Sequence, residues 1–440
     1  MKERSINILR HIGWSMLFKS GSIVSNFMMV PLALSYLGTE DYGIWLTLSS
    51  VLTLFMLLDI GLGNGLRNNF SKAIALGKHE EAQAYISTAY ISITAISTGL
   101  VVSLWFFNYL IDWSIVFNTT SDKSKQFAAL MPILFVFFGL QLIVKLIVSI
   151  SQGDQNHSIQ DKVQFFGQVL SLLSVWFLSK FYEKSLFTFS VFYSLIPLLV
   201  LVFFNIYLFT GRYKRYRPSI NYYNRNYLKR IAGLGVKFFV IQIAAVILFS
   251  TDNFIITHLF GPAEVVPYNL AFKYFSVVAM CYSLLMAPYW SAFTEAYAKK
   301  DISWIRASVA RIQKIWLLVP IVLLILAAKA NWFYVFWVGV DVVVPQLMTL
   351  SMALYVLLLT FNMIYVQFIN GVGKIKLQLI VSVIVIIVNV PLSIFLADYI
   401  NLGSAGVIVA KSICLLIPML LWRIQYIRLI NGTATGIWNK

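Results

Sequence analysis

Residues 377–398 read LQLIVSVIVIIVNVPLSIFLAD, a run whose one charged residue, Asp398, stands at its end. A transmembrane helix needs about 20 mostly apolar residues to cross the hydrocarbon core of a bilayer, and this run has that length and composition. Its apolar residues are continuous, whereas the strands of a membrane β-barrel alternate apolar and polar positions. The segment therefore predicts a membrane-spanning α-helix.

Similar apolar runs recur from one end of the chain to the other. The composition is 60% hydrophobic and 12% charged, with a mean hydropathy of +0.80, whereas soluble domains have about 25% charged residues. The stretches between the runs are too short to form a further folded domain. The sequence predicts an all-α polytopic membrane protein of about twelve spans: 12–37, 43–63, 84–110, 127–150, 162–180, 186–209, 231–259, 266–290, 312–329, 345–370, 377–398 and 404–422.

The positive charges indicate how these spans are oriented. With the N-terminus in the cytoplasm, the inner segments carry 24 of the 34 Lys and Arg residues and the outer loops carry five. Short cytoplasmic loops of membrane proteins are enriched in Lys and Arg. We therefore expect both termini to lie in the cytoplasm.

Metal and nucleotide chemistry find no support in the sequence. The chain has four His and two Cys residues, scattered without the spacing of metal ligands: His11, His79, His157, His258, Cys281 and Cys414. A phosphate-binding Gly-x-x-x-x-Gly-Lys-Ser/Thr motif is also missing from the sequence. We expect no metal site, no cofactor and no direct use of ATP, while coupling to a proton or sodium gradient stays open.

The most basic stretch, residues 211–230, interleaves cations with tyrosines: GRYKRYRPSINYYNRNYLKR. In a soluble protein this pattern is typical of an RNA-binding segment. Between two spans we interpret it as a linker whose Tyr and Arg side chains lie among lipid head groups, with no nucleic-acid partner. Its position divides the chain into a bundle at 1–210, a cytoplasmic linker at 211–230 and a second bundle at 231–440.

Two short echoes suggest that these halves share one plan. Gly38 and Gly261 each begin an outer hairpin with an acid within three residues and an aromatic residue seven positions later. Residues 151–154 (SQGD) and 369–372 (INGV) follow spans four and ten in the same way. An even number of spans per half implies parallel repeats. We expect two six-helix bundles related by a pseudo-two-fold axis along the membrane normal, with spans one and seven lining a central cleft.

Charged residues inside the predicted spans are candidates for a functional site. Each costs about 2.5 to 3.5 kcal/mol to insert and therefore requires a reason. Five are cations and two are acids: Lys19, Lys145, Lys237, Lys273, Lys411, Asp59 and Asp252. Lys145 and Lys237 lie near cytoplasmic ends and could extend to the interface. Lys19, Lys273 and Lys411 lie deeper, which favours a position facing the cleft.

Depth along the helices also suggests ion pairs. Asp252 and Lys273 each lie about seven residues from the turn that joins their spans, and Lys19 and Asp59 come within about one helical turn of each other. These pairs are the structural alternative to a role for the two acids in ion coupling. If both pairs form, Lys411 is left to bind an anion, with Lys145 and Lys237 as further candidates.

Four segments resemble O-antigen repeat-unit flippases of the multidrug/oligosaccharidyl-lipid/polysaccharide exporter (MOP) superfamily. They are SYLGTEDYGIW at 35–45, DIGLGNGLRN at 59–68, NGVGKIKLQ at 370–378 and NLGSAG at 401–406. The resemblance extends over essentially the whole chain, but its motifs are mostly glycine turns, which identify a fold better than a substrate. It provides no catalytic residue.

The resemblance implies that an undecaprenyl-diphosphate-linked oligosaccharide is translocated across the bacterial inner membrane for O-antigen and lipopolysaccharide biosynthesis. Membrane lipids and the polysaccharide polymerase machinery are the further partners that it implies. The excess of buried lysines fits a diphosphate, because cations offset the cost of carrying its charge through a low-dielectric region. We expect a transporter that works by alternating access. The alternatives are a small-solute antiporter of the same fold and a membrane glycan polymerase or glycosyltransferase.

Overall fold

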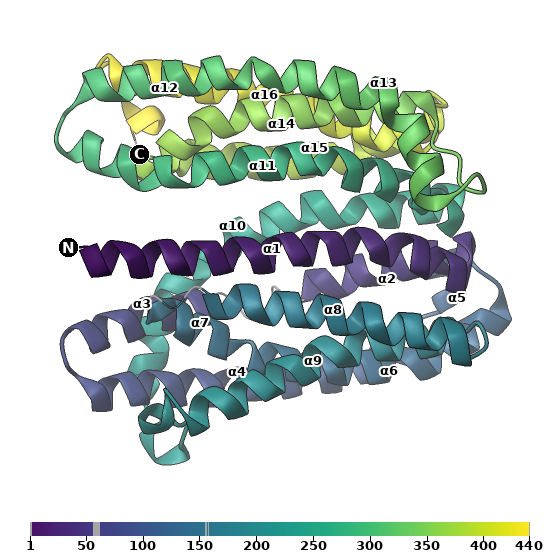
Figure 1. Cartoon of the computed structure of the whole chain (residues 1–440), viewed down its shortest axis with the longest axis horizontal. Helices are drawn as coiled ribbons and strands as arrows, with labels where there is room; N and C mark the ends of the chain where they lie inside the picture. Colours follow the sequence, from purple (N-terminus) through teal and green to yellow (C-terminus); the bar gives the residue numbers. More distant parts are fainter. Residues whose placement is uncertain (1, 56–61, 155, 157, 440) are drawn as a thin grey trace. The chain divides into compact units, whose positions relative to one another are not determined.

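The computed structural model describes residues 2–439 apart from 56–61, 155 and 157, and within this part of the chain all regular structure is helical (Figure 1). It divides into two compact units, residues 1–246 and 247–440. The first unit contains nine α-helices and the beginning of a tenth: α1 (Lys2–Leu37), α2 (Thr39–Phe55), α3 (Leu62–Ala75), α4 (His79–Asn108), α5 (Trp113–Phe117), α6 (Ser121–Val144), α7 (Leu146–Gly153), α8 (Ser158–Phe181), α9 (Leu186–Thr210) and α10 (Arg225–Phe260).

The second unit begins inside α10 and continues to the end of the chain. This long helix is flanked by short 3-10 turns, which are η1 (Lys214–Tyr216) and η2 (Ile220–Tyr222) before it and η3 (Pro262–Glu264) after it. The remaining elements are α11 (Val265–Ala298), α12 (Ile302–Trp316), α13 (Leu318–Val338), α14 (Gln346–Val372), α15 (Lys376–Ile394), the π-helical turn η4 (Phe395–Tyr399), α16 (Ser404–Ile430) and η5 (Gly436–Asn439).

The expected spans correspond to these helices. Among the described residues, nine helical segments are long and apolar enough to cross a membrane: Phe18–Leu37, His79–Asn108, Asp122–Gly153, Ser158–Phe181, Leu186–Thr210, Ile302–Val338, Gln346–Val372, Lys376–Tyr399 and Ala405–Ile430. The other three predicted spans, 43–63, 231–259 and 266–290, coincide with α2, α10 and α11, although 56–61 fall outside the described residues. The prediction of an all-α, multi-pass membrane protein with about twelve spans is confirmed.

In the first unit, α1 packs along α8, α8 packs on α9, and α6 lies against both α4 and α9 (Figure 1). Its buried core is formed by α3, α4, α6, α7, α8 and α9, and it also includes Tyr213 and Ile231. The predicted division began a second bundle at residue 231. Because Ile231 is fully buried in the core of the first unit, the beginning of α10 belongs with that unit in the structure.

The basic linker is folded against α4. The backbone N–H groups of Ser219 and Asn224 donate to the hydroxyl oxygens of Ser87 and Thr88, each over 3.1 Å. At the other end of the linker, the Tyr213 hydroxyl donates to Asp154 over 3.1 Å. Burial, together with the charge of Asp154, raises the pKa of Tyr213 to about 12, so this donor keeps its proton at neutral pH. The linker is therefore anchored along its length.

In the second unit, α14 packs against both α11 and α16, and α15 covers α16 (Figure 1). The π-helical turn η4 follows Pro391 at the end of α15 and contacts α16. Gly406 makes this approach possible, because a Cβ atom there would lie 2.6 Å from the backbone of Ala397. This glycine ends the NLGSAG segment singled out in the sequence.

The two hairpins that echo each other in sequence also share a backbone conformation. Gly38 has a φ of 80° between α1 and α2, and Gly261 has a φ of 90° after α10. Left-handed φ values of this kind are costly for residues with a Cβ atom. Both turns therefore require glycine for the same physical reason, which supports a shared plan for the two halves.

Candidate functional site

The second unit contains an ion pair that is almost completely shielded from solvent. Asp252, on α10, accepts a hydrogen bond from the ammonium group of Lys411, on α16. The two side chains are 1% and 5% exposed. Charges that lose this much solvent are retained when the partner and further hydrogen bonds compensate the desolvation. The pair therefore links two helices that are distant in sequence through one buried electrostatic contact.

Two tyrosines complete this cluster of four residues. The Tyr268 hydroxyl, on α11, donates to the same carboxylate oxygen of Asp252 that binds Lys411. The Lys411 ammonium also lies 5.5 Å from the centre of the Tyr355 ring on α14, within the range of a cation–π contact. The second carboxylate oxygen of Asp252 is buried, and within the described part of the chain it has no hydrogen-bond partner. Residues from four helices thus meet around Asp252, whose second carboxylate oxygen can still accept a hydrogen bond.

The sequence analysis selected Asp252 and Lys411 but not their pairing. It suggested a pair between Asp252 and Lys273, and only if that pair and the one between Lys19 and Asp59 both formed would Lys411 be left without an acid. In the structure, Asp252 binds Lys411 directly. Counting residues from the turn that joins their spans placed Lys273 at the same depth in the membrane as Asp252. The count does not tell which side of each helix faces the other. Tyr268 is the aromatic residue seven positions after Gly261, and nothing in the sequence indicated that its hydroxyl would bind Asp252.

Lys19 also has a partner that the sequence analysis missed. Its ammonium lies 3.8 Å from Asp161 on α8, and the two side chains are 51% and 10% exposed. Asp161 lies one residue before the expected span 162–180, so it was not counted among the membrane acids. The expected partner Asp59 lies outside the described residues, and its pairing and its role in ion coupling stay predictions.

The other predicted lysines are spread over both units. Lys145 is exposed at the break between α6 and α7. Lys273 is partly buried on α11. Lys237 belongs to α10, but its side chain lies outside the described residues. Among the predicted lysines whose side chains are described, Lys411 is thus the one that lies in the buried cluster around Asp252.

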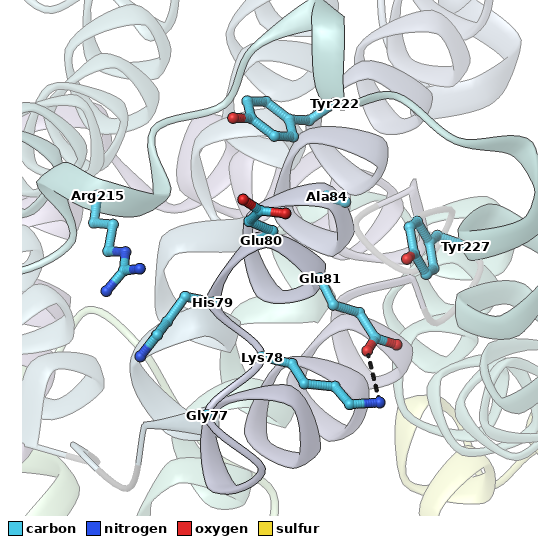
Figure 2. A pocket seen from close by; sticks show the side chains of 9 residues that line it. All are labelled: Gly77, Lys78, His79, Glu80, Glu81, Ala84, Arg215, Tyr222 and Tyr227. Atoms are coloured by element: carbon cyan, nitrogen blue, oxygen red, sulfur yellow. Dashed lines mark ion pairs between the residues drawn. The ribbon is translucent and has the colours of Figure 1, made fainter.

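A separate groove of about 590 Å³ lies where the linker folds over the beginning of α4 (Figure 2). Glu81 lies 3.6 Å from both Lys78 and Arg230, so its charge is compensated from two sides. Tyr222 and Tyr227 stand on the linker side of the groove, and Glu80 lies below Tyr222 (Figure 2). Arg230 thus adds a charged contact between the linker and α4, and we assign the groove a structural role.

Comparison with known proteins identifies the family. A model of the family described as "Polysaccharide biosynthesis protein" matches residues 8–293, more than half of the chain. A protein from Yersinia pseudotuberculosis whose name proposes O-antigen export is 22% identical over 369 residues, which cover 81% of each chain. A protein from Salmonella typhi whose name proposes O-antigen transport is 23% identical over 310 residues, 68% of each chain.

Solved structures identify the fold. A multidrug resistance MATE family transporter of the MOP superfamily, in an inward-facing conformation, superposes with a TM-score of 0.77 at 15% identity, over 94% of this chain and 96% of that one. An outward-facing structure of such a transporter gives a TM-score of 0.67 at 15% identity, over 97% and 96%. The chain belongs to the polysaccharide biosynthesis protein family and has the fold of the MOP superfamily.

Proposed function

We propose that this protein is a flippase that moves an undecaprenyl-diphosphate-linked oligosaccharide from the cytoplasmic to the outer leaflet of the bacterial inner membrane. One observation carries the proposal: membership of a polysaccharide biosynthesis family, with relatives named for O-antigen export or transport over 68–81% of the chain. A multi-pass chain with a transporter fold fits transport better than catalysis. Both termini would lie in the cytoplasm, as the distribution of Lys and Arg predicts.

The substrate has a charged diphosphate that must cross a low-dielectric region. Lysines on the path would offset its desolvation, and the proposed ligands are Lys19, Lys145, Lys237, Lys273 and Lys411. A lysine ammonium is a compact point charge on a flexible stem, which suits a site that must release what it binds. The excess of cations over acids in the spans supports an anionic substrate over a cationic drug.

Lys411 would take part by exchanging partners. In the structure its ammonium is held by Asp252. A diphosphate that reaches Lys411 would compete with this carboxylate, because both are strong acceptors for the same charged donor. Protonation of Asp252 would remove its charge and release the lysine to the substrate. Proton entry at Asp252 would in this way couple a gradient to binding, and alternating access of the two units would complete the cycle.

The test uses the purified full chain in liposomes that contain the lipid-linked oligosaccharide in both leaflets. A membrane-impermeant oxidant reports how much glycan is exposed outside. Wild-type protein should expose nearly all of it over time, whereas protein-free liposomes should keep the inner-leaflet share protected. Lys411→Ala should abolish the exchange and Lys411→Arg should retain part of it. A wild-type chain that leaves the inner-leaflet glycan protected would exclude the proposed function.

Proton coupling is tested in the same liposomes. An imposed proton gradient should accelerate wild-type exchange, and Asp252→Asn, which keeps the size of the side chain without its charge, should transport at a rate independent of the gradient. Gradient-dependent exchange by Asp252→Asn would exclude Asp252 as the coupling group. Loss of exchange at all gradients together with a normal protein level would show that the charge serves binding alone.

A further inference from the structure

A second pocket, of about 640 Å³, lies at the end of the first unit where α1 and α8 finish and the α8–α9 loop begins. This volume falls within the range of small-molecule sites, about 300–1,000 Å³. The lining residues are Leu32, Ser35, Tyr36, Trp176, Ser179, Lys180, Tyr182, Glu183 and Lys184. The predicted orientation places this end of the unit at the outer surface of the membrane, opposite the basic linker.

One aromatic side chain of the pocket is buried and held in place, and two others are about half exposed. Tyr36 is 3% exposed, its hydroxyl donates to the backbone oxygen of Glu183 over 2.7 Å, and its ring stacks on Phe189 with centroids 6.4 Å apart. The loop is therefore held against α1. Trp176 and Tyr182 are 51% and 58% exposed, which leaves ring surface available for a ligand.

The polar side chains of the pocket offer donors and acceptors together. Lys180 and Lys184 provide ammonium donors, Glu183 provides a carboxylate, and two serines provide hydroxyl groups. Within the described residues these lysines form no salt bridge with Glu183 or any other acid. The charge of Glu183 disfavours a simple anion in this pocket, and its five polar side chains disfavour lipid tails.

A sugar ring fits this combination. One face of a pyranose carries C–H groups that pack on an aromatic ring, and its edge carries hydroxyl groups that both donate and accept hydrogen bonds. We propose that this pocket binds pyranose residues of the transported glycan on the outer side of the membrane, with Trp176 and Tyr182 stacking on the rings and Lys180, Glu183 and Lys184 contacting the hydroxyls. The proposal rests on the proposed function, since it makes the pocket the place where the emerging glycan is received.

The test measures binding to the purified full chain in nanodiscs by saturation-transfer NMR. The probe is the soluble oligosaccharide released by mild acid from the surface polysaccharide of the same cells. Wild-type protein should transfer saturation to the C–H protons of the sugar. The Trp176→Ala/Tyr182→Ala variant, which loses both stacking partners, should bind at least tenfold more weakly. Inorganic pyrophosphate, added alone, should not displace the sugar.

The chain offers a matched control for an aromatic membrane belt. Trp105 and Tyr109 are also an exposed pair at the corresponding end of α4, with ring centroids 5.7 Å apart, but they do not line this pocket. Trp105→Ala/Tyr109→Ala should bind the sugar like wild type. If both double variants bind equally, or if pyrophosphate displaces the sugar, the pocket is not a sugar site and its aromatics belong to the interface belt.

Two further measurements distinguish a failure of the pocket inference from a failure of the proposed function. Lys180→Gln/Lys184→Gln changes exposed side chains only, so it keeps the proposal testable if the aromatic variant fails to fold, and it should also weaken sugar binding. In cells, wild-type protein should restore surface glycan to a strain that lacks the gene. If it does not, the proposed function fails. If it does while pocket variants and wild type give equal sugar binding, only the pocket inference fails.

Discussion

At the residue scale, Asp252 and Lys411 stabilise each other because neither charge is accessible to solvent. Removing one partner of a buried pair leaves an uncompensated charge and costs about 3–5 kcal/mol. We therefore expect Asp252→Ala and Lys411→Ala each to lower the thermal unfolding midpoint of the purified protein, and the double variant Asp252→Ala/Lys411→Ala to lie closer to wild type than either single variant.

A pair with more access to solvent provides the control for this cycle. Lys123 lies 2.7 Å from Asp41, and their side chains are 30% and 29% exposed. Because ion pairs at the protein surface contribute about 0–1 kcal/mol, Lys123→Ala and Asp41→Ala should lower the unfolding midpoint less than the variants of the buried pair. A loss in the double variant equal to the sum of the two single losses would show that Asp252 and Lys411 are not coupled.

The residues of the buried cluster show how far sequence reasoning reaches at this scale. Asp252 and Lys411 could be selected because a charge in an apolar run is costly. Their pairing could not be predicted, since the two residues are 159 positions apart and hydropathy does not tell which side of a helix faces the interior. Asp161 was missed because it stands at the edge of a span, where an acid is unremarkable.

At the scale of elements, the contact between η4 and α16 depends on Gly406. A Cβ atom there would meet three backbone atoms, two of Ala397 at 2.6 Å and one of Leu396 at 2.7 Å, and backbone cannot rotate away as a side chain can. Overpacking of this kind costs about 1–3 kcal/mol. We expect Gly406→Ala to lower the unfolding midpoint and the amount of protein in the membrane.

The matched control is Gly99→Ala in α4, where a Cβ atom would meet nothing within 4 Å. Alanine is favoured over glycine in a helix by about 1 kcal/mol, so this variant should be neutral or slightly stabilising. A Gly406→Ala protein as stable as Gly99→Ala would contradict the close approach of η4 to α16.

The linker gives a second prediction for an element. Replacing its two acceptors on α4, as Ser87→Ala/Thr88→Val, leaves the N–H groups of Ser219 and Asn224 without these partners. Each hydrogen bond contributes about 0.5–1.5 kcal/mol. We expect the linker to open more often and trypsin to cleave it faster in limited proteolysis of the purified protein.

The control changes two hydroxyls on the same helix that bond only to α4 itself. Thr94 and Ser103 donate to the backbone oxygens of Tyr90 and Gly99, so Thr94→Val/Ser103→Ala should leave the rate of cleavage unchanged. Cleavage at wild-type rates in the Ser87→Ala/Thr88→Val variant would show that these hydrogen bonds do not hold the linker. The sequence identified the linker by its charge, but its docking depends on neutral hydroxyls, which carry no distinctive pattern.

At the scale of the whole molecule, the spans were predictable because each follows from local hydropathy. Each of the twelve expected segments coincides with helix in the described residues. The boundary between the units was harder to predict, because α10 is a continuous helix of 36 residues and its division depends on contacts such as that of Ile231 with the first core. The amino-acid composition changes at the linker, residues 211–230, whereas the boundary between the two units lies further along the chain, inside α10.

The orientation of the whole molecule is tested by cysteine labelling. Cys281 and Cys414 are first replaced by serine, and single cysteines are then introduced as Asp122→Cys, at a predicted outer end, and Thr435→Cys, in the predicted inner tail; both positions are exposed. Since Lys and Arg gather on the cytoplasmic side, a membrane-impermeant maleimide added to spheroplasts should label Asp122→Cys at once and Thr435→Cys only after lysis. Labelling of Thr435→Cys in intact spheroplasts would reverse the orientation, and it would place the Trp176 pocket on the cytoplasmic side.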